Sequence, residues 1–160
     1  MDDRLEAVRQ VLRDFHVGPE WDAVVDDGIP PELASLLGEL LDAYRHADIE
    51  WLLEHTHPDV EITQIPELPG ARTYRGCEGF IDALLDWPTQ WQDFRVEPLR
   101  VFAVGDDHLV IASIHRGRPS SVDIEVEAEI VFLMRWRDRL LTDWNIFMTV
   151  DEAVAAAQAR

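Results

Sequence analysis

The sequence predicts a one-domain α+β fold, in which helices pack on one face of a mostly antiparallel sheet. Its 160 residues suit a single hydrophobic core. Apolar residues recur at helical spacing through most of residues 2–55, whereas strand-like alternation dominates from residue 93 onward. Helices followed by a run of long strands are typical of an α+β architecture.

The first 34 residues are predicted to form a helical extension, and residues 35–160 the main domain. Residues 2–15 place Leu5, Val8, Val11, Leu12 and Phe15 on one helical face. Residues 16–32 contain two glycines and three prolines, so we expect an irregular connection there. The extension either covers the opening of the main domain or contacts a partner, with Phe15, Trp21 and Val24 as anchors, or it simply adds to the core.

Two helices and a short strand are expected next. Leucines between residues 33 and 41, followed by Tyr44, form the stripe of a buried helix, and a second short helix runs to His55. Residues 60–65 alternate as a strand, and "HTHPD" (55–59) before it reads as a turn organised by His57 and Asp59. Residues 66–76 are rich in turn residues, with a short extended piece at Thr73–Tyr74.

The remainder is predicted to be one more helix and an antiparallel meander. Residues 77–87 have helical spacing and end before Pro88. Four strands follow at about 93–104, 108–117, 122–136 and 139–150, separated by strong turns such as "GDD" and "RDR". A final helix is expected over residues 151–160.

Composition excludes several classes of partner and cofactor. With 14 Lys+Arg against 32 Asp+Glu, the net charge of -18 would repel phosphate backbones and anionic lipid. We therefore expect neither a nucleic-acid nor a membrane partner. The one cysteine cannot pair within the chain, and no Cys/His spacing suits a metal, so no metal or other cofactor is predicted. The charged first ten residues do not look like a signal peptide, and a cytoplasmic location is the default expectation.

The chain resembles the SnoaL-like polyketide cyclases of the nuclear transport factor 2-like superfamily. The resemblance covers roughly residues 35–155 and rests on "ADIEWLLEHTHPDVE" (47–61), "TYRGCEGF" (73–80), "WQDFRVEP" (91–98) and "WNIFMTVDEA" (144–153). It implies a cone, in which a curved, mostly antiparallel sheet and three helices enclose a pocket. It also implies a homodimer through the convex sheet face.

Alternation along the strand "SSVDIEVEAEIVFLMRW" (120–136) separates its two faces. Four acids, from Asp123 to Glu129, share one face with Val131 and Leu133. Burying four neighbouring carboxylates would be costly, so this face must see water or basic partners such as Arg116 and Arg118. The apolar end of the same face, with Phe147 on the next strand, suits either a dimer contact or packing within one chain.

The opposite face is expected to line the pocket. The predicted ligand-binding residues are Leu40, Ile62, Trp87, Trp91, Phe132, Trp144, Ile146 and Met148, although ordinary core packing is the alternative for each aromatic residue.

The resemblance carries few catalytic residues onto this chain. Gln64 stands at the general-base position of the ketosteroid isomerase pattern, Phe132 at its protonated acid, and Leu40 at its tyrosine, with Tyr44 one turn further on. Ile146 stands at the acid position of limonene epoxide hydrolase. The remaining polar candidates are Tyr44 and Gln64, as donors that orient a ligand, and His115, for which a structural role is the alternative.

Two functions therefore stay open. The first is a small-molecule-binding protein for a polyketide-, terpenoid- or steroid-like compound, which could act on it as a cofactor-free isomerase or cyclase. The second is a non-catalytic binding or dimerisation module that keeps the fold without the chemistry, because fold alone does not specify function.

Overall fold

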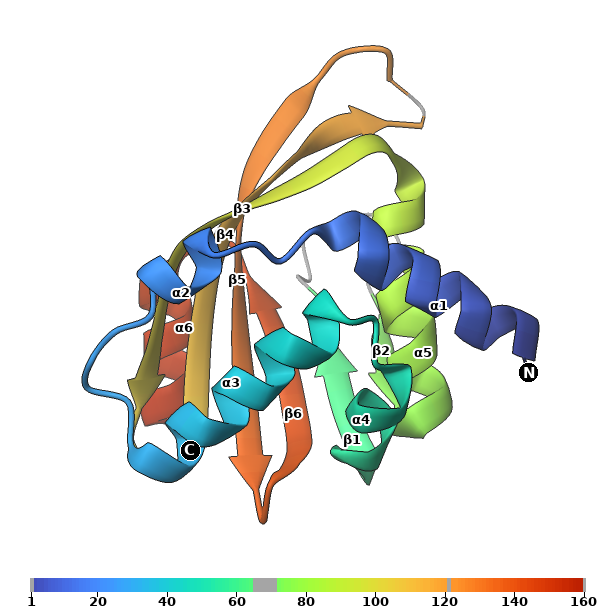
Figure 1. Cartoon of the computed structure of the whole chain (residues 1–160). Coiled ribbons are helices and arrows are strands. Elements are labelled where there is room, and N and C mark those ends of the chain that lie inside the picture. The colour runs from blue at the N-terminus through green and yellow to red at the C-terminus, as the bar shows by residue number, and fades with distance from the viewer. Residues whose placement is uncertain (1, 65–71, 121, 160) are drawn as a thin grey trace.

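A six-stranded curved sheet forms the centre of the computed structural model, which describes residues 2–64, 72–120 and 122–159 (Figure 1). The strand order is β2-β1-β6-β5-β4-β3. The strands are β1 (Thr56–Thr63), β2 (Thr73–Arg75), β3 (Trp91–Val104), β4 (His108–Pro119), β5 (Val126–Arg137) and β6 (Leu140–Phe147). Strands β3 to β6 form the predicted antiparallel meander, and β1 joins β6 in the one parallel pairing of the described sheet.

Helices account for most of the remaining chain. They are α1 (Asp2–Phe15), α2 (Glu20–Ala23), α3 (Pro31–Arg45), α4 (Ile49–Glu54), α5 (Gly76–Asp86), the 3-10 turn η1 (Pro88–Gln90) and α6 (Val150–Gln158). The prolines at 30 and 31 suit the start of α3, because a proline in the first turn removes no helical hydrogen bond. Asp48 caps α4 by accepting from the Trp51 backbone N–H at 3.1 Å. No described helix is long and apolar enough to cross a membrane.

Three strand boundaries differ most from the sequence prediction: the starts of β1 and β5, and the end of β6, which lies at Phe147 instead of residue 150. β1 starts at Thr56, so "HTHPD" is mostly strand instead of a turn; its pairing with β6 shifts register between Thr56 and Glu61. His57 Nδ1 accepts the Asp59 backbone N–H at 2.9 Å within this irregular stretch. β5 starts at Val126, four residues later than predicted. Residue 65 of the predicted first strand, and most of the turn-rich segment after it, lie outside the described residues.

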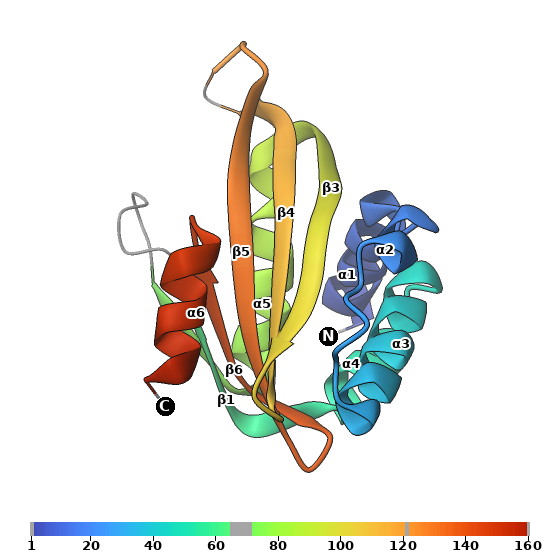
Figure 2. The same ribbon diagram turned by 90° about the vertical axis from the view of Figure 1, so that its left-hand side faces the viewer.

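The concave face of the sheet packs on the helices of the first half of the chain. Its core includes Leu109 and Ile111 of β4, Met134 of β5, and the leucine stripe of α3. Trp21 and the α1 residues Val8 and Leu12 belong to the same core. Figure 2 shows α1, α2, α3 and α4 gathered on this side of the long strands, with α6 on the other.

Helix α6 covers the convex face, a placement that differs from the expectation of helices on one face only. Its Ala153 and Ala157 pack with Val131 and Leu133 of β5, and Phe147 joins them. Small alanine side chains let the helix approach the sheet closely. The apolar end of this face is therefore buried within one chain, which is the packing alternative to a dimer contact.

The acidic end of the same face is solvated and paired with arginines. Arg116 Nε donates to Glu127 at 2.8 Å, and Arg95 pairs with Glu125. Arg118 lies 3.8 Å from Asp123. The sequence prediction of water and basic partners around these carboxylates is confirmed, and such exposed pairs contribute little stability each.

The extension before α3 is fixed to the main domain at both ends. Arg4 pairs with Glu78, at 2.7 Å, and with Asp82 of α5. Arg9 Nη2 donates to Glu50 of α4 at 2.6 Å. Further along, the Val101 backbone N–H donates to the Val24 carbonyl at 3.0 Å, which binds the extension to β3.

Replacing Leu133 tests the buried contact with α6. The side chain is fully buried, so Leu133→Ala should lower the free energy of unfolding by about 2–5 kcal/mol in a urea titration. Glu129→Ala, on the same face of β5 but exposed, should change it by less than about 0.5 kcal/mol. Equal effects of the two changes would contradict the burial of the convex face under α6.

Candidate functional site

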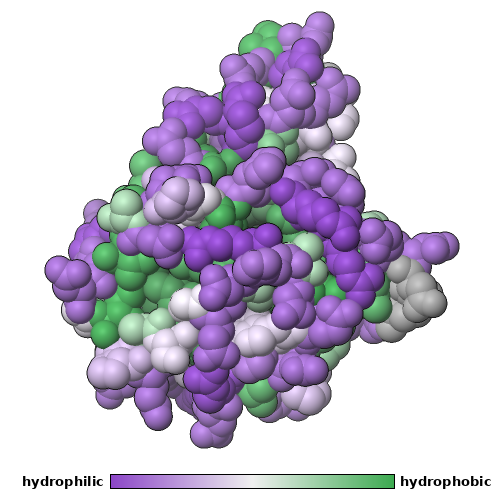
Figure 3. Space-filling model, viewed as in Figure 1, coloured by the Kyte–Doolittle hydropathy of each residue, from purple (hydrophilic) through white to green (hydrophobic). Residues whose placement is uncertain are grey.

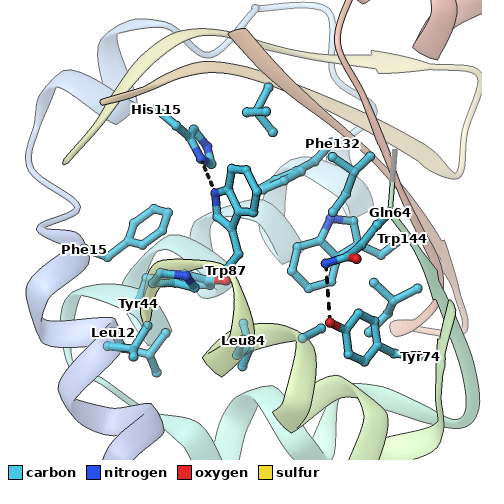
Figure 4. Close-up of a pocket in the computed structure, with 16 residues that line it drawn as sticks. Leu12, Phe15, Tyr44, Gln64, Tyr74, Leu84, Trp87, His115, Phe132 and Trp144 are labelled. Carbon is cyan, nitrogen blue, oxygen red and sulfur yellow. Dashed lines mark hydrogen bonds between the residues drawn. The ribbon is translucent and has the colours of Figure 1, made fainter. Parts of the chain in front are cut away.

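An apolar cavity lies between the concave face of the sheet and helices α1, α3 and α5 (Figure 4). The centre of a water-sized sphere can reach about 60 Å³ of it, enough for on the order of four to six waters. Its lining residues are Val11, Leu12, Phe15, Tyr44, Ile62, Gln64, Tyr74, Ala83, Leu84, Trp87, Pro88, His115, Ile130, Phe132, Trp144 and Ile146.

Strand pairing explains how the sheet contributes its wall. Ile62 of β1 pairs with Trp144 of β6, and Phe132 of β5 pairs with Ile146 of β6. Because alternate residues face the same side, Gln64 joins Ile62 on this face. The rings of Phe132 and Trp144 meet edge-on, with centroids 5.1 Å apart. The indole N–H of Trp144 is buried without a hydrogen-bond partner in the described chain.

The extension supplies the opposite wall. Val11, Leu12 and Phe15 of α1 line the cavity, and the Phe15 ring meets the Tyr44 ring edge-on at 5.5 Å. Figure 3 shows that the molecular face carrying α1 and α3 is mostly hydrophilic, with apolar surface in the gaps between these segments. The inward face of α1 is therefore part of the candidate site.

Two further spaces adjoin the cavity. An outer groove of about 390 Å³ shares Val11, Phe15 and Pro88 with it and continues past Trp91 and Phe94. Gly117 of β4 allows Trp91 and Gln92 of β3 to lie close to its backbone, because a Cβ there would lie 3.0 Å from the Gln92 carbonyl oxygen and the Trp91 ring. An inner chamber of about 40 Å³ shares Phe15, Tyr44 and Phe132 with the cavity. Leu40 and Trp21 line this chamber.

His115 is held in one neutral tautomer inside the wall. Trp87 Nε1 donates to His115 Nδ1 at 3.0 Å, and an indole nitrogen can only donate, so the ring proton lies on Nε2. Nε2 is 3.2 Å from Ser113 Oγ, whose hydroxyl donates to the Ile130 carbonyl at 3.4 Å. Burial lowers the pKa of His115 to about 4. Both ring nitrogens are occupied, an arrangement that favours a structural role over proton transfer.

Tyr44 presents, at the junction of the spaces, a hydroxyl that has no hydrogen-bond partner among the described residues. Its side chain lines both the cavity and the inner chamber. No described residue forms a hydrogen bond with its Oη, and burial raises the pKa of Tyr44 to about 12. The group therefore stays protonated and is available to donate to a bound molecule.

The polar partner of Gln64 is Tyr74, a residue that the sequence analysis did not select. Gln64 Nε2 donates to Tyr74 Oη at 3.4 Å, and Gln64 Oε1 accepts the Arg72 backbone N–H at 3.3 Å. Tyr74 Oη in turn donates to Asp86 Oδ2 at 2.7 Å. The signal that could have identified Tyr74 is its pairing with Ile62, a cavity residue, in the short β1–β2 ladder.

The structure brings most of the predicted site residues together. Those around the cavity are Tyr44, Ile62, Gln64, Trp87, His115, Phe132, Trp144 and Ile146. Leu40 lines the inner chamber instead, and Trp91 the outer groove. The placement of Met148 is wrong: β6 ends at Phe147, so the next residue leaves the inner face and its side chain is 43% exposed.

Clustered metal ligands are absent from the described chain: no three His, Cys, Asp or Glu side chains in it are placed to hold an ion.

The curved sheet and its helices define a cone-shaped α+β domain of the nuclear transport factor 2-like kind. The chain belongs to the SnoaL-like domain family, whose sequence profile matches residues 37–144.

Solved structures share this fold at low sequence identity. A putative SnoaL-like polyketide cyclase from Jannaschia sp. CCS1 superposes with a TM-score of 0.60 at 14% identity, over 84% of this chain and 97% of that one. A nuclear transport factor 2-like protein from Burkholderia xenovorans LB400 gives 0.57 at 21% identity, over 78% and 93%. TerC co-crystallised with polyporic acid gives 0.58 at 22% identity, over 81% and 97%. A search of curated protein sequences finds no match.

The neutral, buried state of His115 predicts a specific loss of stability in acid. An unfolded histidine has a pKa near 6.5, above the folded value, so the unfolded chain binds the extra proton first as pH falls. This residue should remove about 3 kcal/mol of unfolding free energy between pH 6.5 and 4. Urea titrations across this range should show a smaller decline for His115→Gln, and an unchanged decline for the exposed His46→Gln. Parallel curves for wild type and His115→Gln would contradict the assignment.

Proposed function

We propose that this protein binds a small, largely apolar molecule of polyketide-, terpenoid- or steroid-like character in the cavity. The observation that carries the proposal is a partly enclosed apolar space whose polar groups are few and convergent, the usual composition of a small-molecule site. Gln64 and Tyr44 would orient the ligand by hydrogen bonds. The buried indole N–H of Trp144 offers a further donor beside the wall, since an unpaired buried donor gains from an acceptor.

The size of the cavity limits how the ligand is held. The enclosed space suits about one ring, and typical drug-sized sites have volumes of roughly 300–1,000 Å³. A larger ligand would place one end in the cavity and extend into the outer groove past Trp91 and Phe94. Movement of the Phe15 ring would join these spaces to the inner chamber. TerC, with which polyporic acid was co-crystallised, supports only the point that a protein of this fold was crystallised with a small organic molecule.

A non-catalytic binding module is the second candidate. The observation that favours it is the absence of a carboxylate among the described residues that line the cavity, together with the occupied ring nitrogens of His115. In this reading the fold and the cavity remain, and ligand binding itself is the activity. The extension over residues 1–34 then serves as the cover of the site in both cases.

A cavity-filling change tests the proposal directly. N-phenyl-1-naphthylamine, a neutral apolar dye that fluoresces in dry sites, should bind the wild-type protein and raise its melting temperature. Ala83→Phe should abolish both effects, because Ala83 lines the cavity and the added ring would occupy it. Ala34→Phe, an exposed alanine of α3, should leave them unchanged.

The outcomes separate clearly. Equal dye binding by wild type and Ala83→Phe would place the dye elsewhere and overturn the proposed site. In a thermal-shift screen of hydrophobic metabolites, Tyr44→Phe and Gln64→Ala should each weaken binding by about fivefold to tenfold, the loss of one hydrogen bond. Unchanged affinities would remove these two residues from the site.

A homodimer through the convex face stays a prediction, but its contact surface would be polar instead of apolar. Because α6 occupies Val131 and Leu133, a partner would meet the ladder of acids and arginines around Arg116. Each copy carries a net charge of -18, and salt screens the repulsion between the two copies. Sedimentation velocity should therefore show a dimer that is stronger in about 0.5 M salt than at low ionic strength. A monomer under both conditions would assign the convex face to α6 packing alone.

A further inference from the structure

A chain of hydrogen bonds crosses the cavity wall and reaches solvent. Its inner member is Tyr74, whose side chain lines the cavity and is 5% exposed. Tyr74 Oη donates to Asp86 Oδ2 at 2.7 Å. Asp86 is the last residue of α5, and its side chain is 38% exposed. One hydroxyl therefore links the dry interior to a carboxylate in contact with water.

Neighbouring groups fix the geometry of this pair. Arg72 Nη2 donates to the same Asp86 Oδ2 at 2.7 Å, and its guanidinium lies 4.4 Å from the centroid of the Tyr74 ring. The arginine holds the carboxylate against the tyrosine and keeps the ring in place. Gln64 Nε2 approaches Tyr74 Oη from the cavity side at a long 3.4 Å. A ligand donor could displace this weak contact.

The proton between the two groups belongs to Tyr74. Burial raises the pKa of Tyr74, and the hydrogen bond to Asp86 raises it further. The hydroxyl hydrogen is directed at Asp86, so the oxygen lone pairs remain for a donor on the cavity side. Tyr74 thus presents an acceptor to the cavity, with a carboxylate behind it to take up a proton.

The other polar groups of the wall lack this arrangement. Both ring nitrogens of His115 are engaged by Trp87 and Ser113. Tyr44 has no described hydrogen-bond partner to receive its proton, and its pKa is about 12. Among the described lining residues, Tyr74 is the one hydroxyl backed by a carboxylate.

We propose that Tyr74 and Asp86 form a proton relay between the cavity and water, which equips the site for cofactor-free proton abstraction or return. The substrate class is a small apolar carbon or oxygen acid, such as an enolisable carbonyl compound or a phenol. This inference rests on the proposed ligand cavity and assigns it a reaction class. Tyr74 is the catalytic residue, and Asp86 acts through it.

The steps conserve protons and electron pairs. The substrate's C–H or O–H bond breaks, its electron pair stays on the substrate, and the proton moves to Tyr74 Oη. The Tyr74 O–H bond breaks at the same time, and that proton moves to Asp86 Oδ2. Asp86 then releases it to water, or the sequence reverses to protonate the substrate at another atom, which completes an isomerisation.

A generic carbon acid can test the relay without knowledge of the natural substrate. In 5-nitrobenzisoxazole, removal of the ring C–H proton breaks the N–O bond and yields a coloured cyanophenolate. Its turnover is measured by absorbance, and its binding separately by displacement of N-phenyl-1-naphthylamine. Tyr74→Phe should lower kcat by roughly 100-fold, the usual contribution of a positioned base. Asp86→Asn should lower kcat similarly while KM stays constant, because the loss is confined to the chemical step.

Matched variants separate the relay from a structural effect. Asp106→Asn, in the turn between β3 and β4, removes an exposed carboxylate that does not line the cavity and should keep wild-type turnover. Asp86→Glu should recover much of the rate lost in Asp86→Asn. The wild-type reaction should slow in heavy water, since the Tyr74 hydroxyl proton moves in the rate-limiting step, and Tyr74→Phe should lose this isotope effect.

Each result decides between the claims. If the probe displaces the dye but Tyr74→Phe and Asp86→Asn turn it over like wild type, the relay is overturned and the binding cavity stands. The same conclusion follows if wild type binds the probe without turning it over. If the dye binds in the cavity but the probe does not displace it, the cavity does not take such a carbon acid, and the relay is overturned while the binding function stands. If the dye itself does not bind in the cavity, the binding function and the relay fail together.

Discussion

The alternation of side chains along β5 is the constraint on which the rest of the structure depends. From Val131 to Met134 successive side chains enter two different cores, so the sheet must be covered on both faces. The alanine-rich helix α6 lies flat against one face. On the other face the sheet curves, and α1, α3 and α5 bridge it. Side chains of limited length leave space between a curved sheet and straight helices, and that space is the cavity.

Local pattern was sufficient to predict much of this arrangement. The meander, the helix boundaries at residue 15 and near Pro31, and the solvated acids from Asp123 to Glu129 follow from periodicity and from the cost of burying charge. The position of α6 did not follow, because an alanine-rich helix has too weak an apolar stripe to indicate its face. The early start of β1 depends on the pairing of Thr56 with Leu141, a contact distant in sequence.

The residues of the candidate site also differ in how far the sequence pattern could predict them. Gln64, Phe132 and Trp144 were placed by alternation in strands long enough to show it. Tyr74 lies in a strand of three residues, where alternation gives no signal and only the register with β1 directs it inward. Asp86 was indistinguishable from any other acid at a helix end until Tyr74 was placed beside it. Polar groups that come together from different helices and strands thus cannot be predicted from the pattern of any one segment.

The attachment of α1 also bears on how quickly a molecule could enter or leave. The helix carries Leu12 and Phe15 over the cavity, and its polar side is held by exposed ion pairs such as Arg9 with Glu50. Each such pair contributes only about 0–1 kcal/mol. Local unfolding of α1 costs mainly the exposure of its buried Val8 and Leu12, which is less than unfolding of the whole sheet. The rate at which a bound molecule leaves the cavity and the rate of amide hydrogen exchange along α1 then both depend on the opening of this helix. A bound molecule that stabilises the closed state lowers the rate of exchange.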